Sequence, residues 1–322
     1  MKLTLNYYDQ EVEIEFDPSK VIWKSQNFGQ YSHNGLYIPE IDEHVFVKRN
    51  IDTLDSANLL CSMRDDEKPL PYMPEVFGLF EIEGLKDKYK SYLFMEKVSG
   101  CTLLETIKEV KRNDCHQILR SVLFSLETII DKGHWFTDLD LRNIMFHKEQ
   151  GEVFTWLIDI DSCLPEETMF VDFMKNRGGL NNVNERYWSC MVKVAKTQGV
   201  FEKLSGKTVT QAAFVYFAID LFFRITYPDN PFNLKPDDIF RLMNNTSKYI
   251  SAETQDQWRD IHNLLVEDPE NGCEWEELDT FATLLFGFDE PLIPKASVAE
   301  AIAETVLEEG SNLLDKLFKL FK

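Results

Sequence analysis

Two stretches of the chain decide the fold: Phe136-Thr-Asp-Leu-Asp-Leu-Arg-Asn-Ile-Met-Phe146 and Trp156-Leu-Ile-Asp-Ile-Asp-Ser162. The first ends in the apolar segment Ile144-Met145-Phe146, and the second continues the apolar segment Phe154-Thr155-Trp156-Leu157-Ile158. The turn Lys148-Glu149-Gln150-Gly151 stands between the two segments. Short apolar runs on both sides of such a turn are typical of a β-hairpin, so the sequence predicts a small hairpin here, set among helices.

Three polar side chains flank this predicted hairpin. Asp138 and Asn143 lie five positions apart just before its first strand, and Asp159 follows its second strand. Because a hairpin brings these two ends to one rim, we expect the three side chains to meet there. Phosphoryl transfer needs such a set, namely a carboxylate at the acceptor hydroxyl and hard oxygen ligands for the Mg²⁺ that bridges the ATP phosphates. The pattern therefore favours ATP- and Mg²⁺-dependent chemistry.

At these residues the sequence resembles the protein-kinase superfamily. Asp138-Leu139 to Asn143 is similar to the catalytic loop H-R-D-L-x-x-x-N, and Leu157-Ile158-Asp159-Ile160-Asp161 stands where that family has D-F-G. Phe46-Val47-Lys48 resembles the strand with the ATP-phosphate lysine, Leu93 to Gly100 resembles the gatekeeper and hinge, and Phe214 to Phe232 resembles the long buried helix of the large lobe. The order and spacing of the segments agree over most of the chain. The Asp-x-Asp in place of D-F-G is similar to some atypical bacterial Ser/Thr kinases.

The resemblance implies roles for individual residues of the large lobe. Asp138 would be the catalytic base or would orient the acceptor hydroxyl, while Asn143 and Asp159 would hold Mg²⁺. Asp161 replaces the glycine of D-F-G, and it is expected either to be a further metal ligand or to fix the loop in one state.

It also implies a nucleotide site in the small lobe. Lys48 would pair with the α- and β-phosphates, and backbone groups near Glu96 and Val98 would bind adenine, with Phe94 as the gatekeeper. Gly29 stands where a glycine loop over the phosphates is expected, although the segment lacks a full G-x-G-x-x-G pattern. The glutamate that usually pairs with the lysine has no clear counterpart.

The chain also departs from the family pattern. Phe136 and Thr137 replace the His and Arg before the catalytic Asp, so we expect no switch that reads a phosphorylated loop. Asp140 stands in place of the lysine that stabilises transition-state charge, and nearby Arg142 is the candidate to supply that charge instead. Phe214 occupies the position of the Asp that usually anchors the long helix.

The expected fold is α+β, a bilobal protein-kinase-like domain. Residues 1–95 show mostly period-two alternation and form the β-rich N-lobe, in which residues 53–63 alone have helical periodicity. Residues 96–290 are mostly helical and form the C-lobe, with a mobile loop near 176–184. Residues 291–322 form an amphipathic helical tail that either packs on the large lobe or docks a partner.

Composition excludes several classes of protein. Among 322 residues, 34 Lys and Arg oppose 55 Asp and Glu, and the formal charge of −21 argues against nucleic-acid binding. No apolar run is long enough to span a membrane, and the N-terminus lacks the apolar stretch of a signal peptide. The six Cys are scattered without a C-x-x-C pair, which favours a reduced, cytoplasmic protein.

The favoured function is phosphoryl transfer from ATP to Ser or Thr hydroxyls of a protein, and the acidic surface favours a basic acceptor. Two alternatives stay open. One is a pseudokinase that serves as a nucleotide-binding or scaffold module, as the loss of the His-Arg pair, Asp140 and the incomplete glycine loop indicate. The other is a small-molecule kinase of the aminoglycoside-phosphotransferase type, which shares the Asp…Asn…Asp core.

Overall fold

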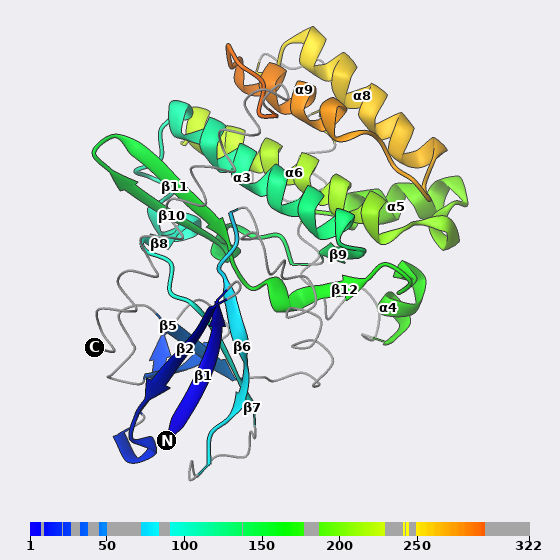
Figure 1. The fold of residues 1–322 in the computed structure, drawn as a ribbon. Coiled ribbons are helices and arrows are strands. Elements are labelled where there is room, and N and C mark those ends of the chain that lie inside the picture. The colour runs from blue at the N-terminus through cyan, green and yellow to red at the C-terminus, as the bar shows by residue number, and fades with distance from the viewer. Residues whose placement is uncertain are drawn as a thin grey trace. The chain divides into compact units, whose positions relative to one another are not determined.

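The computed structural model describes residues 1–7, 10–20, 22–26, 33–37, 45–49, 72–83, 91–136, 138–176, 187–228, 241, 243–244 and 249–293. The chain divides into two compact units, one of Met1–Ser99 with Lys295–Lys322 and one of Gly100–Pro294. The described part of the first is rich in strands, and the second is mainly helical, so the fold is mixed α+β (Figure 1). The predicted helix at 53–63 lies outside the described residues, as do residues 294–322 of the predicted tail, Gly29 and residues 177–186.

A five-stranded antiparallel sheet forms the larger part of the first unit. Its strands, in spatial order, are β3 (Ile22–Gln26), β4 (His33–Tyr37), β5 (Val45–Arg49), β7 (Ser91–Glu96) and β6 (Val76–Glu81). The central strand β5 carries Lys48, which is paired in register with Gly35 of β4 and with Leu93 of β7. The sheet therefore places Lys48 between β4 and β7, and β7 is the strand that leads into the candidate hinge.

An N-terminal hairpin, β1 (Lys2–Tyr7) with β2 (Gln10–Glu15), completes the described part of this unit. The period-two alternation of the sequence predicts both strands, and the structure confirms them. Leu3, Leu5 and Ile14 are buried while Glu13 and Glu15 are exposed, because successive side chains of a strand point to opposite faces. A hairpin alone is marginally stable, so its apolar face needs this burial.

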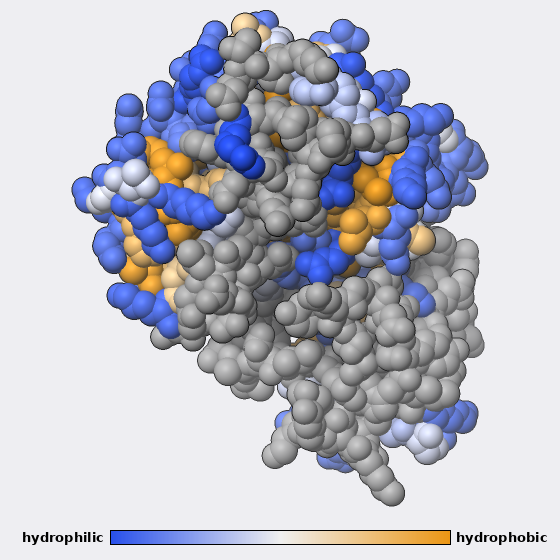
Figure 2. All heavy atoms as spheres, turned by 180° about the vertical axis from the view of Figure 1, so that it is seen from behind, coloured by the Kyte–Doolittle hydropathy of each residue, from blue (hydrophilic) through white to orange (hydrophobic). Residues whose placement is uncertain are grey.

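The second unit is built around the helix α6 (Gly206–Thr226), which is buried along most of its length. The other helices are α2 (Leu103–Thr106), α3 (Arg112–Asp131), α4 (Phe170–Asn176), α5 (Ser189–Gln198), α8 (Ala252–Glu267) and α9 (Trp275–Phe286). By length and apolar composition α6 could span a membrane, but 89% of its apolar window is buried inside the unit, as in the core helix of a globular domain. In Figure 1, α3 and α6 run alongside each other with α8 and α9 on one side of them. Hydrophilic side chains cover much of the described surface in Figure 2, with apolar patches between them.

The helical periodicity of the sequence from Leu103 to Lys111 predicts a helix over this range, and that length is wrong. Helix α2 ends at Thr106 and a turn follows before α3 begins at Arg112. Thr102 and Glu105 form a reciprocal capping box at the start of α2, so the local signal for a helix is real. The short turn lets the chain change direction before α3, which covers almost all of the second stretch with helical periodicity, Cys115 to Lys132.

Short strands lie between the helices. The predicted hairpin is confirmed as β10 (Ile144–Glu149) and β11 (Glu152–Leu157), with β8 (Cys101–Thr102) on the other side of β10. Gln150 and Gly151 make its turn with φ of 52° and 96°, the left-handed conformations that a two-residue hairpin turn requires. A second pair, β9 (His134–Phe136) with β12 (Cys163–Pro165), has no counterpart in the sequence prediction.

Candidate active site in the helical unit

The β10–β11 hairpin brings the ends of the two motif stretches together. Ile144 is paired in register with Leu157, and the backbone N–H of Ile158 donates to the carbonyl of Asn143 at 2.8 Å. Asp159 is the next residue after this hydrogen bond, so its backbone lies beside the end of the candidate catalytic loop. The sheet thus brings the backbone of Asn143 next to that of Ile158, the residue before Asp159.

Asn143 is tied to Asp138 by two hydrogen bonds. Its side-chain Nδ2 donates to the backbone carbonyl of Asp138 at 2.8 Å and to Oδ2 of the same residue at 3.0 Å. Asn143 is 8% exposed and ends the short 3₁₀ turn η2 (Leu141–Asn143). Since both donors of the amide face Asp138, the amide oxygen Oδ1 is the atom left to accept a hydrogen bond or to bind a cation. The arrangement therefore orders a carboxylate and an amide oxygen side by side.

Asp159 has an uncommon backbone conformation. Its φ of 61° and ψ of 32° lie in the left-handed region, where few residues other than glycine are found. It precedes the 3₁₀ turn η3 (Ile160–Ser162), and its side chain does not cap that turn. Such conformations cost free energy and concentrate at functional sites. The side chain of Asp161, inside η3, lies outside the described residues.

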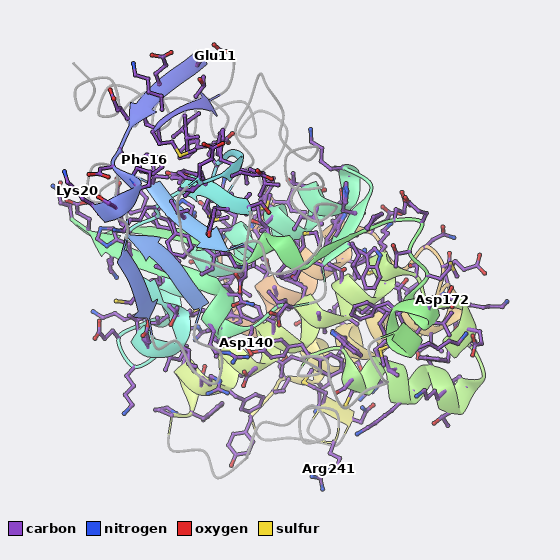
Figure 3. All side chains as sticks on the ribbon, turned by 90° about the horizontal axis from the view of Figure 1, so that it is seen from below. Glu11, Phe16, Lys20, Asp140, Asp172 and Arg241 are labelled. Atoms are coloured by element: carbon purple, nitrogen blue, oxygen red, sulfur yellow. The ribbon has the colours of Figure 1, made fainter. Side chains whose placement is uncertain are left out.

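Asp140 and Arg142 form a charge pair inside the candidate catalytic loop. Asp140 Oδ1 accepts from the backbone N–H of Arg142 at 2.9 Å and from its Nε at 2.8 Å, while Nη2 reaches Oδ2 at 3.3 Å. Asp140 is buried and lies inside the helical unit in Figure 3, whereas Asp172 and Arg241 are at its rim. The hydrogen bond that Arg142 donates to Asp140 raises the pKa of Arg142, burial partly opposes this, and electrostatic interaction with Asp140, Asp138 and Tyr187 adds to the rise. Arg142 therefore neutralises Asp140 and lies close to Asp138.

The base of the loop is fastened to α6. Thr210 Oγ1 accepts from the backbone N–H of Phe136 at 3.2 Å and is within hydrogen-bonding distance of the carbonyls of Phe136 and Gly206. The resemblance places the helix anchor at Phe214, but that residue is a fully buried apolar side chain. The anchoring contact is made one helical turn earlier, by a neutral hydroxyl.

Sequence reasoning missed a second buried network on α6. Asp220, with no exposed surface, accepts from the hydroxyl of Tyr187 at 2.9 Å and from Nε of Arg224 at 2.9 Å. The ring of Tyr187 also packs edge-on against Phe217. A signal was available, because Asp220 alone interrupts the longest apolar stretch of the chain. Buried carboxylates of this kind are paired as a rule.

The candidate nucleotide residues belong to the other unit. Lys48 is 7% exposed on the central strand, and Phe94 is fully buried and packs edge-on against Phe80 at 5.1 Å. The backbone N–H of Glu96 donates to the carbonyl of Glu75 at 2.8 Å, so that N–H is not available to adenine. Val98 lies just beyond β7 and is partly exposed. These residues share one unit, and Asp138, Arg142, Asn143 and Asp159 share the other.

The described residues contain no ready-made cluster of metal ligands, and the chain matches no known family. Among the described residues, no group of three or more His, Cys, Asp or Glu side chains is arranged to hold a metal ion. A pair such as Asn143 and Asp159 is smaller than such a group. Mg²⁺ often takes only one or two protein carboxylates beside substrate phosphates. No protein-family model matches the chain, and the search of curated proteins found no match.

Proposed function

We propose that the chain is a bilobal protein-kinase-like enzyme of the cytoplasm that transfers the γ-phosphate of ATP to Ser or Thr hydroxyls of a protein. The observation that carries the proposal is the double hydrogen bond from Asn143 to Asp138, next to the backbone link from Ile158 to Asn143. These contacts fix Asn143 against Asp138 and bring the residue before Asp159 next to Asn143, at one end of the β10–β11 hairpin. Phosphoryl transfer depends mainly on positioning and on charge stabilisation, which is what such a set supplies.

The donor chemistry fits a magnesium ion and a nucleotide. Asn143 Oδ1 and the Asp159 carboxylate are hard oxygen donors of the type that Mg²⁺ prefers, and bound Mg²⁺ would offset the charge of the ATP phosphates. Asp138 would accept a hydrogen bond from the acceptor hydroxyl and take its proton. Lys48, on the central strand of the other unit, would contact the α- and β-phosphates. Asp161 stays a proposed further metal ligand.

Arg142 has a narrower proposed role than the sequence suggests. Its Nε and Nη2 are engaged by Asp140, so it cannot act as an unconstrained replacement for the missing lysine. The pair instead holds one edge of the guanidinium and leaves Nη1 directed away from Asp140. We propose that the opposite edge of the guanidinium, which carries Nη1, contacts the transferring phosphoryl group or the acceptor.

The pseudokinase alternative draws on the same pair. Asp140 stands where the family has a lysine, and Arg142 forms an ion pair with Asp140. In this alternative the charge of Arg142 is used to neutralise Asp140 and not to stabilise the transferring phosphoryl group. A protein that binds Mg-ATP without transferring phosphate would fit this alternative. Transfer to an aminoglycoside-type small molecule but to no peptide would fit the remaining one.

Transfer of labelled γ-phosphate from Mg-ATP to a serine-containing protein acceptor tests the proposal. We expect label with the wild type and none with Asp138→Asn, which keeps the size of the side chain. Asp172→Asn, at an exposed position of α4, is the matched control and should behave as wild type. A Mg-ATP-dependent rise in melting temperature that Asp159→Asn abolishes would separate nucleotide binding from transfer. Equal labelling by wild type and Asp138→Asn would reject the proposed role of Asp138.

A further inference from the structure

Two arginines of the helical unit are each held at one edge by a buried carboxylate. Nε of Arg142 lies 2.8 Å from Asp140 Oδ1, and Nε of Arg224 lies 2.9 Å from Asp220 Oδ1. The aspartate side chains are 1% and 0% exposed, while the arginine side chains are 31% and 25% exposed. Burial of a carboxylate is unfavourable unless a cation compensates it, so each pair fixes the position of its guanidinium.

Each guanidinium keeps hydrogen-bond donors beyond its aspartate. Arginine has five N–H donors in a rigid planar fork. Among the described residues, no group accepts from Nη1 of Arg142, and none accepts from Nη1 or Nη2 of Arg224. A guanidinium that is already oriented loses less conformational entropy when its outer edge binds a carboxylate or phosphate. Both arginines therefore have the geometry of anion-binding groups.

Tyr187 places both arginines in one neighbourhood. Its hydroxyl donates to Asp220 Oδ2 at 2.9 Å, and the other oxygen of that carboxylate accepts from Arg224. Tyr187 and Asp138 are also both close enough to Arg142 for their charges to act on it. Tyr187 is thus bound to the Asp220–Arg224 pair and is also near enough to Arg142 to influence it electrostatically.

We infer that Arg142 and Arg224 recognise an acidic polypeptide, with the acceptor hydroxyl at Asp138 and carboxylates of the same peptide at the two guanidinium edges. The inference rests on the proposed function and names its acceptor class. It runs against the basic acceptor that the net charge of −21 favours. Net charge acts on the approach of a partner over long distances, whereas oriented arginines act at contact. Asp140 and Asp220 are already compensated, so they offer little attraction to a basic side chain.

Peptide binding tests the inference without relying on catalysis. Fluorescence anisotropy would measure the affinity of the full chain, with Mg-ADP present, for a serine peptide flanked by Asp and Glu and for the same peptide with Lys at those positions. We expect the acidic peptide to bind at least about tenfold more tightly. Arg224→Gln should lower the affinity for the acidic peptide by about tenfold and leave the affinity for the basic peptide unchanged. Arg259→Gln, on α8, removes an exposed arginine and should have no effect.

Several outcomes would overturn the inference. Tighter binding of the basic peptide, or equal binding of the acidic peptide by wild type and Arg224→Gln, rejects it. If Arg224→Gln fails to melt cooperatively, Arg224→Lys, which keeps a cation beside Asp220 but loses the fork, should still weaken the acidic peptide alone. Phosphate transfer to the same peptides separates the two proposals. Transfer only to the basic peptide rejects the inference of an acidic acceptor but supports the proposed kinase function. Tight binding of the acidic peptide without transfer supports the acidic partner but rejects the kinase function.

Discussion

At the scale of single residues, the candidate site is defined by which donors and acceptors are already used. Asn143 donates both N–H groups of its side-chain amide to Asp138, so its amide oxygen remains to bind another group. Asp140 is almost completely buried and depends on Arg142 for compensation of its charge. The loop therefore combines one ordered polar pair with one compensated ion pair, and each makes a different prediction.

Removal of Arg142 should destabilise the protein through Asp140. Arg142→Ala leaves a buried carboxylate without its cation, and we expect a loss of roughly 2–3 kcal/mol in the free energy of unfolding. The double variant Asp140→Asn/Arg142→Ala should recover part of that loss, because the amide costs less to bury. Urea denaturation of wild type, both single variants and the double variant measures the coupling. Additive effects of the two changes would show that the pair contributes nothing.

At the scale of secondary-structure elements, two contacts between elements of the helical unit each lead to a prediction, and they are named here the first and second joint. One lies between α6 and the strand β9, where Thr210 contacts Phe136 and Gly206 lies against Trp135. Trp135 also donates from Nε1 to the carbonyl of Pro165 at 3.0 Å, which links β9 to β12. The other joint lies between α3 and α9, where the carboxylates of Glu127, Asp131 and Glu276 come close enough to interact.

The first joint should not tolerate a methyl group at Gly206. A Cβ there would lie 2.1 Å from Cγ of Trp135, so α6 or the ring must shift. We expect Gly206→Ala to lower the free energy of unfolding by about 1–3 kcal/mol. Thr210→Val should cost about 1–2 kcal/mol, since it leaves the buried N–H of Phe136 without its acceptor, and Thr210→Ser should restore most of it.

Thermal and urea denaturation would test this joint. Lys207→Ala, in the same turn of α6 but with the side chain partly exposed, is the control. A wild-type melting temperature for Gly206→Ala would contradict the close approach of α6 and Trp135.

The second joint should make stability depend on pH. Burial raises the pKa of Glu127 from 4.5 to about 7, and Asp131 and Glu276 add to the effect. The folded state therefore holds a proton that the unfolded chain has lost, and this contribution to stability is complete below pH 4.5 and disappears as the pH rises to about 7. Glu127→Gln should remove this part of the dependence and exceed the stability of the wild type by about 1 kcal/mol at pH 8, a value reduced for the water that still reaches the carboxyl.

Denaturation across this pH range provides the measurement. Glu149→Gln, at the exposed turn of β10 and β11, serves as the control. A parallel pH profile for Glu127→Gln and wild type would reject the assignment.

At the scale of the whole molecule, two units with separate cores share a chain of high negative charge. The first unit buries its sheet and the N-terminal hairpin, and the second buries α6 among the other helices. The formal charge of −21 opposes compaction through self-repulsion, and salt screens that repulsion. The screening length falls from about 30 Å at 0.01 M salt to about 8 Å at 0.15 M.

Salt should therefore stabilise the protein as a whole. We expect the melting temperature to rise by a few degrees between these two salt concentrations, because repulsion between like charges is weakened. Differential scanning calorimetry in NaCl and in KCl would distinguish screening, which acts equally with both salts, from specific ion binding. A melting temperature that falls with salt would mean that attractive surface ion pairs outweigh the repulsion.

Local patterns in the sequence were sufficient to predict the β10–β11 hairpin, the N-terminal strands, the long helices and the closeness of Asp138 and Asn143. Period-two and helical alternation, turn residues and motif spacing are all local, so a linear reading can detect them. Only the tertiary structure showed that Thr210 accepts a hydrogen bond from Phe136 and that Arg142 forms an ion pair with Asp140. It also showed that Tyr187 and Arg224 both donate to Asp220. Partners such as Phe136 and Thr210 are far apart in the chain, and their pairing follows from how the elements pack, which periodicity does not encode.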